Sequence, residues 1–334
     1  MLCSIVLSVV FVISVVVQPA FASAAEGLRP NIIFILADDW GLGDVGAYHT
    51  LLAKGIDKPA TPNLDRLARE GTLFTDFHTL GAECSPSRAS WVTGRSPSDK
   101  AVRIHLVIGD HANNANKGCA DYLNTSTPTI MSTLASQGYS VGHYGKWHIG
   151  DNKADPKAGV LAAPSPKAYG VEKSRCYVCN PDDPNDPSTS YDLGDTWFPS
   201  NSSRLIVDDV LTHIDNATSQ GRPFYINMWF HISHAPMLPT QNQLDAYATF
   251  INGGKLPPTG AASLCNNMAN DVQFYPTCAS LVYRASQFEA DAQIGRLLSN
   301  IRANQSLDNN TLVIFSTDNG PEDPHIYMNS KVSR

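Results

Sequence analysis

Acidic and amide side chains close two strongly apolar segments of this 334-residue sequence. NIIFILADD ends in Asp38 and Asp39, and TLVIFSTDNG carries Asp318 and Asn319 near its end. Either pair alone is also typical of a cap or a turn, where Asp and Asn are common. Three carboxylates gathered at strand ends repel one another unless a cation lies between them, and oxygen-only ligands suit Ca²⁺ or Mg²⁺ better than Zn²⁺. Together the two pairs predict a site for a hard divalent cation.

Basic and proton-transferring side chains follow two further apolar segments. In GYSVGHYGKWHIG, Lys146 and His148 are two residues apart, so on an extended chain they point the same way. FHISHAP supplies His231 and His234. A single buried histidine is more often structural, but the shared position after strands favours a functional role. Cations and imidazoles beside a hard metal predict an anionic ester substrate, a phosphate or a sulfate.

A lone cysteine, Cys84, lies in the segment GAECSPSRASWVTGR. A disulfide, a metal ligand and a nucleophile are the three ordinary roles for it. Pro86 can begin a helix, which would place Cys84 at an N-terminus, where the helix dipole favours anions. Arg88 follows one turn later and is suited to hold a negative oxygen. The segment predicts the nucleophile of the site, although a thiolate is a poor partner for a hard cation.

Strands and helices alternate along the chain and would position these residues. Strands are expected in NIIFILADD, TLFTDFHT, YSVGHYG, RPFYINMWFHI and TLVIFSTDNG, and helices near 61–71, 127–138, 203–219 and 279–304. Thr61 and Thr127 are each followed by a proline, the pattern of an N-cap and a first helical residue. The alternation predicts an α/β fold with a large, mostly parallel central sheet and helices on both faces. Ligands of such sheets bind at the carboxyl ends of the strands.

Two segments interrupt the alternation, 151–200 and 240–278. Both are rich in polar residues, proline or glycine, and we expect long surface loops at the rim of a pocket. Two cysteine pairs could close disulfides there, Cys176 with Cys179 and Cys265 with Cys278. Zinc binding by CYVC is the less favoured alternative, because no second CxxC or HxxxH follows it.

Composition and the N-terminus indicate the compartment and exclude some partners. A formal net charge of −7 and the absence of a basic stripe argue against nucleic-acid binding. Residues 1–24 resemble a cleaved signal peptide that ends in small residues, which leaves 25–334 as the mature chain. No other segment could cross a bilayer, so stable membrane insertion is not expected. Five glycosylation sequons fit a secreted or lysosomal glycoprotein: Asn124, Asn201, Asn216, Asn304 and Asn309.

Several ordered segments together resemble the sulfatase family of the alkaline-phosphatase-like superfamily. They are ADDWGLGDVGAY, TPNLDRLAREGTLFTDFHT, CSPSRASWVTGR with its C-x-P-S-R pattern, GYSVGHYGKWHIG and STDNGP. The resemblance implies that a formylglycine-generating enzyme converts Cys84 to Cα-formylglycine, whose hydrate offers oxygen in place of sulfur. It also implies that the modified residue binds Ca²⁺, rather than Mg²⁺, together with Asp38, Asp39, Asp318 and Asn319.

The resemblance implies a mechanism as well. One oxygen of the hydrated residue 84 attacks the sulfur of a sulfated small molecule or glycan, the alcohol leaves, and the second hydroxyl expels sulfate. Arg88 would stabilise the hydrated residue, and Lys146 would bridge it and the sulfate. His148 would take the proton in the expulsion step, and His234 would protonate the leaving oxygen.

The sequence departs from the family pattern at three places. Met237 stands where family members commonly carry a histidine, so that His234 lies three residues earlier than expected. After DNGP the family continues to a glycine-rich segment with a sulfate-binding lysine and to a small antiparallel sheet. Lys331 lies in no such segment, so we expect a catalytic domain that is incomplete at its C-terminal end, without the small sheet domain. Trp91 replaces the usual aliphatic residue in the cysteine motif.

Two alternatives to a sulfatase remain at this point. A formylglycine-dependent phosphodiester or phosphonate monoester hydrolase would share the C-x-P-S-R motif. An inactive, truncated sulfatase-like protein that binds sulfated glycans would fit the shortened C-terminus and Met237. The sequence does not select among aryl sulfate, glycosaminoglycan sulfate and algal polysaccharide sulfate as substrates.

Overall fold

The computed structural model describes most of the chain. The described residues are 29–51, 58–104, 114, 116–150, 162–180, 190–191, 197–234, 237–258, 260 and 277–321. The predicted signal peptide, the expected partner Cys265 and the C-terminal Lys331 lie outside these ranges. Among the described residues, no helix is both long enough and apolar enough to cross a membrane.

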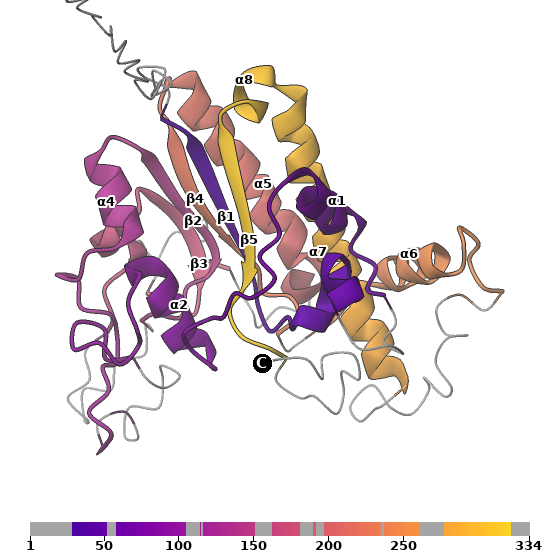
Figure 1. Cartoon of the computed structure of the whole chain (residues 1–334), viewed down its shortest axis with the longest axis horizontal. Helices are drawn as coiled ribbons and strands as arrows, with labels where there is room; N and C mark the ends of the chain where they lie inside the picture. The colour runs from indigo at the N-terminus through magenta and orange to yellow at the C-terminus, as the bar shows by residue number, and fades with distance from the viewer. Residues whose placement is uncertain are drawn as a thin grey trace, which may run out of the picture.

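A five-stranded parallel sheet forms the centre of the molecule, with the strand order β3-β2-β4-β1-β5 (Figure 1). Its strands are β1 (Asn31–Ala37), β2 (Ser140–Lys146), β3 (Lys173–Tyr177), β4 (Phe224–Trp229) and β5 (Thr311–Thr317). The registers pair Ala37 with Thr317 and Lys146 with Tyr177, so the carboxyl ends of these strands lie along one edge. The residues that follow the strands are therefore delivered to a common place.

Helices cover both faces of the sheet, as predicted (Figure 1). One face carries α1 (Pro62–Glu70), α5 (Trp197–Ser219), α7 (Thr277–Ala303) and α8 (Gln305–Asp308), and the other carries α2 (Cys84–Thr93) and α4 (Ile130–Ser136). A further helix, α6 (Gln241–Ile251), packs on α7. Short 3-10 helices are η1 (Leu42–Asp44), η2 (Gly46–Leu51) and η3 (Pro166–Tyr169).

Strand β1 separates two hydrophobic cores. Ile33 and Ile35 are buried in the core beneath α5 and α7, whereas Phe34 and Leu36 are buried in the core beneath α2 and α4. Successive side chains of a strand point to opposite faces of the sheet, and a strand covered on both faces is apolar throughout. That is why NIIFILA reads as a continuous apolar run.

Most of the predicted elements are present, and three expectations are wrong. The segment TLFTDFHT forms no strand, and Phe74 and Phe77 are exposed; its alternation has no neighbouring strand to pair with among the described residues. The two expected loops contain β3 and α6. Helix α4 begins at Ile130 after the N-cap Thr129, two residues later than the Thr127 cap that the sequence suggested.

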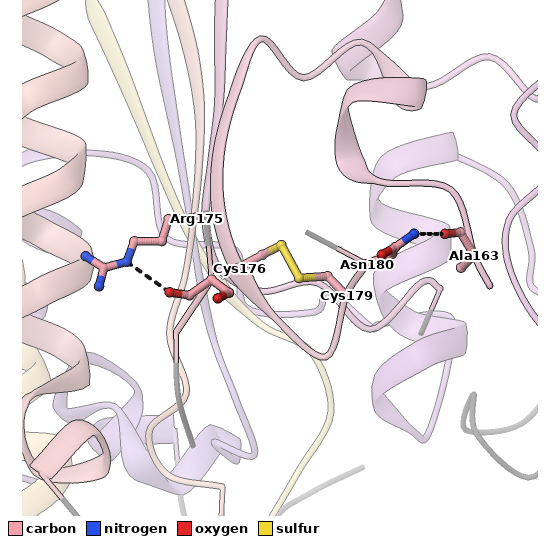
Figure 2. Close-up of a disulfide and its surroundings, with 6 residues drawn as sticks. Ala163, Arg175, Cys176, Cys179 and Asn180 are labelled. Atoms are coloured by element: carbon pink, nitrogen blue, oxygen red, sulfur yellow. Dashed lines mark hydrogen bonds between the residues drawn. A yellow bond between two sulfur atoms is a disulfide. The ribbon is translucent and has the colours of Figure 1, made fainter. Parts of the chain in front are cut away.

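One of the two predicted disulfides is confirmed. Cys176, in β3, is bonded to Cys179 just beyond the strand, and the two Cα atoms are 6.2 Å apart (Figure 2). The side chain of Cys278 lies outside the described part of the chain, as does Cys265, so the second pair stays a prediction. Among the described cysteines, Cys84 and Cys119 are free thiols.

Candidate active site

Asp38 is the centre of a buried cluster of charges at the carboxyl edge of the sheet. Its carboxylate accepts hydrogen bonds from Lys146 Nζ at 2.7 and 2.9 Å and from Arg88 Nη2 at 2.8 Å. Arg88 Nη2 also donates to Asp318 Oδ2 at 2.6 Å. The side chains of Asp38, Arg88 and Asp318 are fully buried. The structure thus brings together residues of β2 and α2 with the residues that follow β1 and β5.

Cys84 is the first residue of α2 and lies against this cluster. Its Sγ is 3.8 Å from Asp38 Oδ1, and Lys146 Nζ donates to Sγ at 3.4 Å. Burial, together with the negative charges of Asp38 and Asp318, raises the pKa of the Cys84 thiol to about 12. An unmodified thiol at this position therefore stays protonated at neutral pH and is a weak nucleophile.

Burial and neighbouring charges shift the pKa values of the three carboxylates in different directions. Burial alone would raise the pKa of Asp38, but Lys146 and Arg88 outweigh it and hold that pKa well below its usual range. Burial and the adjacent Asp38 raise the pKa of Asp39. Burial, opposed by Arg88 and reinforced by Asp38, raises the pKa of Asp318 to about 7. The two cations therefore compensate Asp38 far better than the other two acids.

Asn319 carries a buried amide oxygen that could bind a cation. Its Nδ2 donates to Asp39 Oδ1 at 2.6 Å and to the Gly320 carbonyl at 2.7 Å, whereas its Oδ1 is buried and has no hydrogen-bond partner among the described residues. A buried amide oxygen without a hydrogen-bond partner lowers the free energy of unfolding, because its desolvation is not compensated. Ligand atoms of Asp38, Asp39 and Cys84 also lie within 4.8 Å of one another. An oxygen-rich set with an unsatisfied amide oxygen fits a hard divalent cation.

Helix α7 supports the backbone that carries Asp39. Asp39 has a left-handed backbone conformation, with φ of 59°, which is uncommon for a residue other than glycine. Tyr283 Oη lies 3.2 Å from the Asp39 carbonyl and 2.6 Å from Asp44 Oδ2, and Asp44 also accepts from the Gly41 amide at 2.8 Å. Arg284 Nη1 donates to Asp44 Oδ1 at 3.0 Å. Sequence reasoning missed this support; the only signal was an acid within the WGLGD segment.

Arg88 is held from several sides. Its Nη1 donates to the Lys146 carbonyl at 3.0 Å, and its guanidinium lies 5.2 Å from the centre of the Trp229 ring. The hydroxyl of Ser87 donates to the Asp318 carbonyl, which ties α2 to the end of β5. Trp229 is the last residue of β4 and was not singled out from the sequence, because its contact with Arg88 joins residues far apart in the chain.

The histidines are placed in different ways. Ring nitrogens of His231 and His234 and a carboxylate oxygen of Asp38 lie within 4.8 Å of one another, so the structure brings His234 to the site despite Met237. His148 is buried two residues beyond Lys146, and its backbone N–H donates to the Val178 carbonyl at 3.0 Å. The positions are those the sequence suggested, and the catalytic roles remain predictions.

A parallel sheet gathers acids, an amide, an arginine and a lysine at its carboxyl edge, an arrangement suited to bind an anionic ester beside a cation. This chain belongs to the sulfatase family, whose family model, Sulfatase, matches residues 30–330.

The chain is similar to proteins of known activity over most of its own length. It is 30% identical to arylsulfatase A of Bos taurus over 90% of this chain and 54% of that protein. It is 27% identical to N-acetylgalactosamine-6-sulfatase of Rattus norvegicus over 87% of this chain and 50% of that protein. The chain therefore spans about half the length of the curated relatives it matches.

Solved structures share the fold. Ps i-CgsB in complex with k-i-k-neocarrahexaose superposes with a TM-score of 0.60 at 24% identity, over 89% of this chain and 60% of that one. A structure solved with its substrate D-glucosamine-2-N,6-O-disulfate superposes with a TM-score of 0.53 at 18% identity, over 87% of this chain and 66% of that one.

Proposed function

We propose that this protein hydrolyses organic sulfate esters, with residue 84 matured from cysteine to formylglycine and a Ca²⁺ ion held beside it. The observation that carries the proposal is the buried contact of Cys84 with both Asp38 and Lys146, at 3.8 and 3.4 Å. This places the candidate nucleophile between a predicted metal ligand and a cation. Membership of the sulfatase family supports the same reaction.

Four oxygen-bearing side chains would hold the cation: Asp38, Asp39, Asp318 and Asn319. The unpartnered Oδ1 of Asn319 supports this set, because a bound cation would satisfy it. Bound Ca²⁺ would supply positive charge that polarises the sulfate group. Ca²⁺ is proposed over Mg²⁺ because it accepts a set of several protein oxygens, whereas Mg²⁺ usually keeps waters.

Residue 84 needs oxygen to act at this site. The hydrate of a formylglycine aldehyde supplies one oxygen nucleophile and a second hydroxyl whose ionisation lets sulfate leave. Lys146 Nζ already donates to Sγ of residue 84 and to Asp38, so it is placed to hold an oxygen at that position. Arg88, at the same carboxylate, would stabilise the negative charge of the hydrate.

Two histidines would move the protons. His234, close to Asp38, would protonate the leaving alcohol, and His148 would accept a proton from the second hydroxyl of residue 84. The formylglycine-generating enzyme would be the maturation partner in the secretory pathway, and the mature protein would be secreted or lysosomal. A sulfated small molecule or glycan is the proposed substrate, in keeping with the substrate bound in one structural neighbour.

The experiment is a sulfate-release screen of the full chain, secreted from a eukaryotic host, on aryl sulfates and sulfated glycans. Mass spectrometry of the peptide with residue 84 measures the aldehyde. We expect the aldehyde in the active protein, no turnover by Cys84→Ala, and loss of turnover on chelation that added Ca²⁺ restores. Residue 84 found only as cysteine would refute the formylglycine mechanism. A strong preference for phosphodiesters in parallel assays would identify a phosphoester hydrolase instead.

A further inference from the structure

A short disulfide-closed turn begins in the last two residues of β3 (Figure 2) and lies beside the end of β2. Cys176 and Cys179 are 0% and 4% exposed, so the disulfide is part of the interior. Between them lie Tyr177, also buried, and Val178, which is partly buried against the core beneath α5 and α7. We call residues 176–179 the disulfide turn.

The disulfide turn continues the pairing between β3 and β2 beyond the end of the sheet. The last register pair is Lys146 with Tyr177. After it, the Trp147 amide donates to the Tyr177 carbonyl at 3.1 Å, and the His148 amide donates to the Val178 carbonyl at 3.0 Å. The backbone that carries His148 is therefore bonded to the two residues enclosed by the disulfide.

Both residues of the outer pair have left-handed backbone conformations. The φ angle is 54° at His148 and 50° at Val178. A β-branched residue is a marked outlier in this region, and such conformations persist only where the surroundings enforce them. The disulfide restricts the turn on both sides of Val178, so it is the covalent restraint closest to the strained residue. Release of that restraint would allow Val178 to relax and its carbonyl to turn away from His148.

The disulfide turn also contributes a side chain to the site. The ring of Tyr177 packs edge-on against His231, with the ring centres 5.3 Å apart, and His231 in turn lies near His234 and Asp38. Outside the disulfide, Arg175 Nε donates to the Ser190 carbonyl at 3.2 Å, and Asn180 Nδ2 donates to the Ala163 carbonyl at 2.8 Å (Figure 2). These two bonds hold the flanks of the turn, whereas the disulfide is the covalent restraint on the two residues between the cysteines.

We propose that the Cys176–Cys179 disulfide is a positioning element that fixes the backbone of His148, through the carbonyls of Tyr177 and Val178, for proton transfer. The proposal rests on the proposed sulfatase function for its kinetic consequence. Its structural part, the restraint on Trp147 and His148, is measurable without any turnover. A disulfide that serves only overall stability would restrain the whole sheet instead.

The test compares the full chain with the double variant Cys176→Ala/Cys179→Ala. We expect hydrogen–deuterium exchange to rise in peptides that contain Trp147 and His148, while peptides of β1 and β4 keep their protection. We expect kcat for sulfate release to fall by about 10- to 100-fold, as displacement of a catalytic group by about 1 Å does, with KM changed less. Cys119→Ala, which removes a free thiol and leaves the disulfide intact, is the matched control and should match the wild type.

A third variant separates positioning from general stabilisation. Asn favours the left-handed region that Val resists, so Val178→Asn in the double-alanine background should restore part of kcat and part of the protection of His148. Unchanged exchange at Trp147 and His148 in the double variant would overturn the proposal. Exchange that rises equally across all strands, without rescue by Val178→Asn, would overturn it as well. If the wild type releases no sulfate from any ester, the proposed function fails, and the exchange measurements alone decide the role of the disulfide.

Discussion

The two halves of the candidate site are built and supported differently. The β1–β5 half supplies oxygens, from Asp38, Asp39, Asp318 and Asn319, and helix α7 braces it through side-chain hydrogen bonds of Tyr283. The β2–β3 half supplies Lys146 and His148, and the disulfide turn braces it through backbone carbonyls. The oxygen half retains an unsatisfied amide oxygen, whereas Lys146 already has its partners. Under the proposed function, one half would hold the cation and the other the anionic group of the substrate.

The largest effect is expected where the two halves meet, at Asp38. The change Asp38→Asn removes the carboxylate that holds both Lys146 and Arg88. Breaking a buried ion pair from one side costs about 3–5 kcal/mol of unfolding free energy. Urea denaturation measures the loss, and turnover should disappear with it. Asp39→Asn, which contacts neither cation in the described structure, should be less destabilising; equal losses would show that the halves are not joined through Asp38.

The next effect is expected at Arg88 of α2, which bonds Asp38 in one half and the Lys146 carbonyl in the other. Arg88→Lys keeps a positive charge but loses the fork that joins Asp38, Asp318 and the Lys146 carbonyl. We expect kcat to fall by about 10²- to 10³-fold, as it does when one preorganised donor is lost. Calorimetric titration with Ca²⁺ should give an affinity within about threefold of wild type. A Ca²⁺ affinity that falls in parallel with kcat would show that the two halves do not act separately.

A smaller effect is expected for the support from α7, and it should fall on Ca²⁺ affinity rather than on kcat. Tyr283→Phe removes the hydroxyl that bonds Asp44 and lies near the Asp39 carbonyl. Loss of an outer partner of a metal ligand typically costs about 10- to 100-fold in metal affinity, so Ca²⁺ should bind more weakly. At saturating Ca²⁺, kcat should stay close to wild type.

The matched control for Tyr283→Phe is Tyr48→Phe, which removes an exposed hydroxyl that donates to the Phe74 carbonyl. Its Ca²⁺ affinity should equal that of wild type. If the two variants bind Ca²⁺ equally well, α7 has no part in preparing the oxygen half.

The smallest effect is expected at the start of β3, far from the disulfide turn. Glu172 accepts a two-pronged ion pair from Arg222, with both side chains partly exposed. Glu172→Gln should lower the unfolding free energy by about 0.2–1 kcal/mol, as surface pairs do, and leave kcat unchanged. Thermal denaturation and sulfate release measure the two quantities. A fall in kcat comparable to that of the double-alanine variant would mean that any loosening of β3 disturbs His148.

The sequence is sufficient for four of the five strands in the described sheet. Strands β1 and β4 are buried along nearly their whole length, and continuous apolar runs predict such strands. The strands β2 and β5 are also predicted, although β5 is an edge strand that is partly exposed. The edge strand β3, KSRCY, is missed because it is short and carries two charged residues. The segment TLFTDFHT was predicted as a strand and is not one, because alternation of apolar side chains does not supply a pairing partner.

The residues of the candidate site also differ in whether the sequence alone can predict them. Asp38, Cys84, Arg88, Lys146 and Asp318 were located from local motifs, and the structure brings their side chains together. Their supports could not be found in this way. The bond from Tyr283 to the Asp39 carbonyl spans 244 residues. The left-handed φ angle at Val178 cannot be inferred from its residue type.

Because the side chains of β1 alternate between two cores, the length of this strand sets the position of Asp38. If Asp38 keeps its place, insertion of one residue before it would exchange the faces of Ile33 and Ile35 with those of Phe34 and Leu36 and disrupt the packing of both cores. If the strand keeps its place instead, insertion of two residues leaves the faces unchanged but carries Asp38 about 6.6 Å away from its contacts with Arg88 and Lys146, at a rise of about 3.3 Å per residue. The length of β1 is therefore constrained by the packing of its side chains and also by the position of Asp38, the acid that follows it.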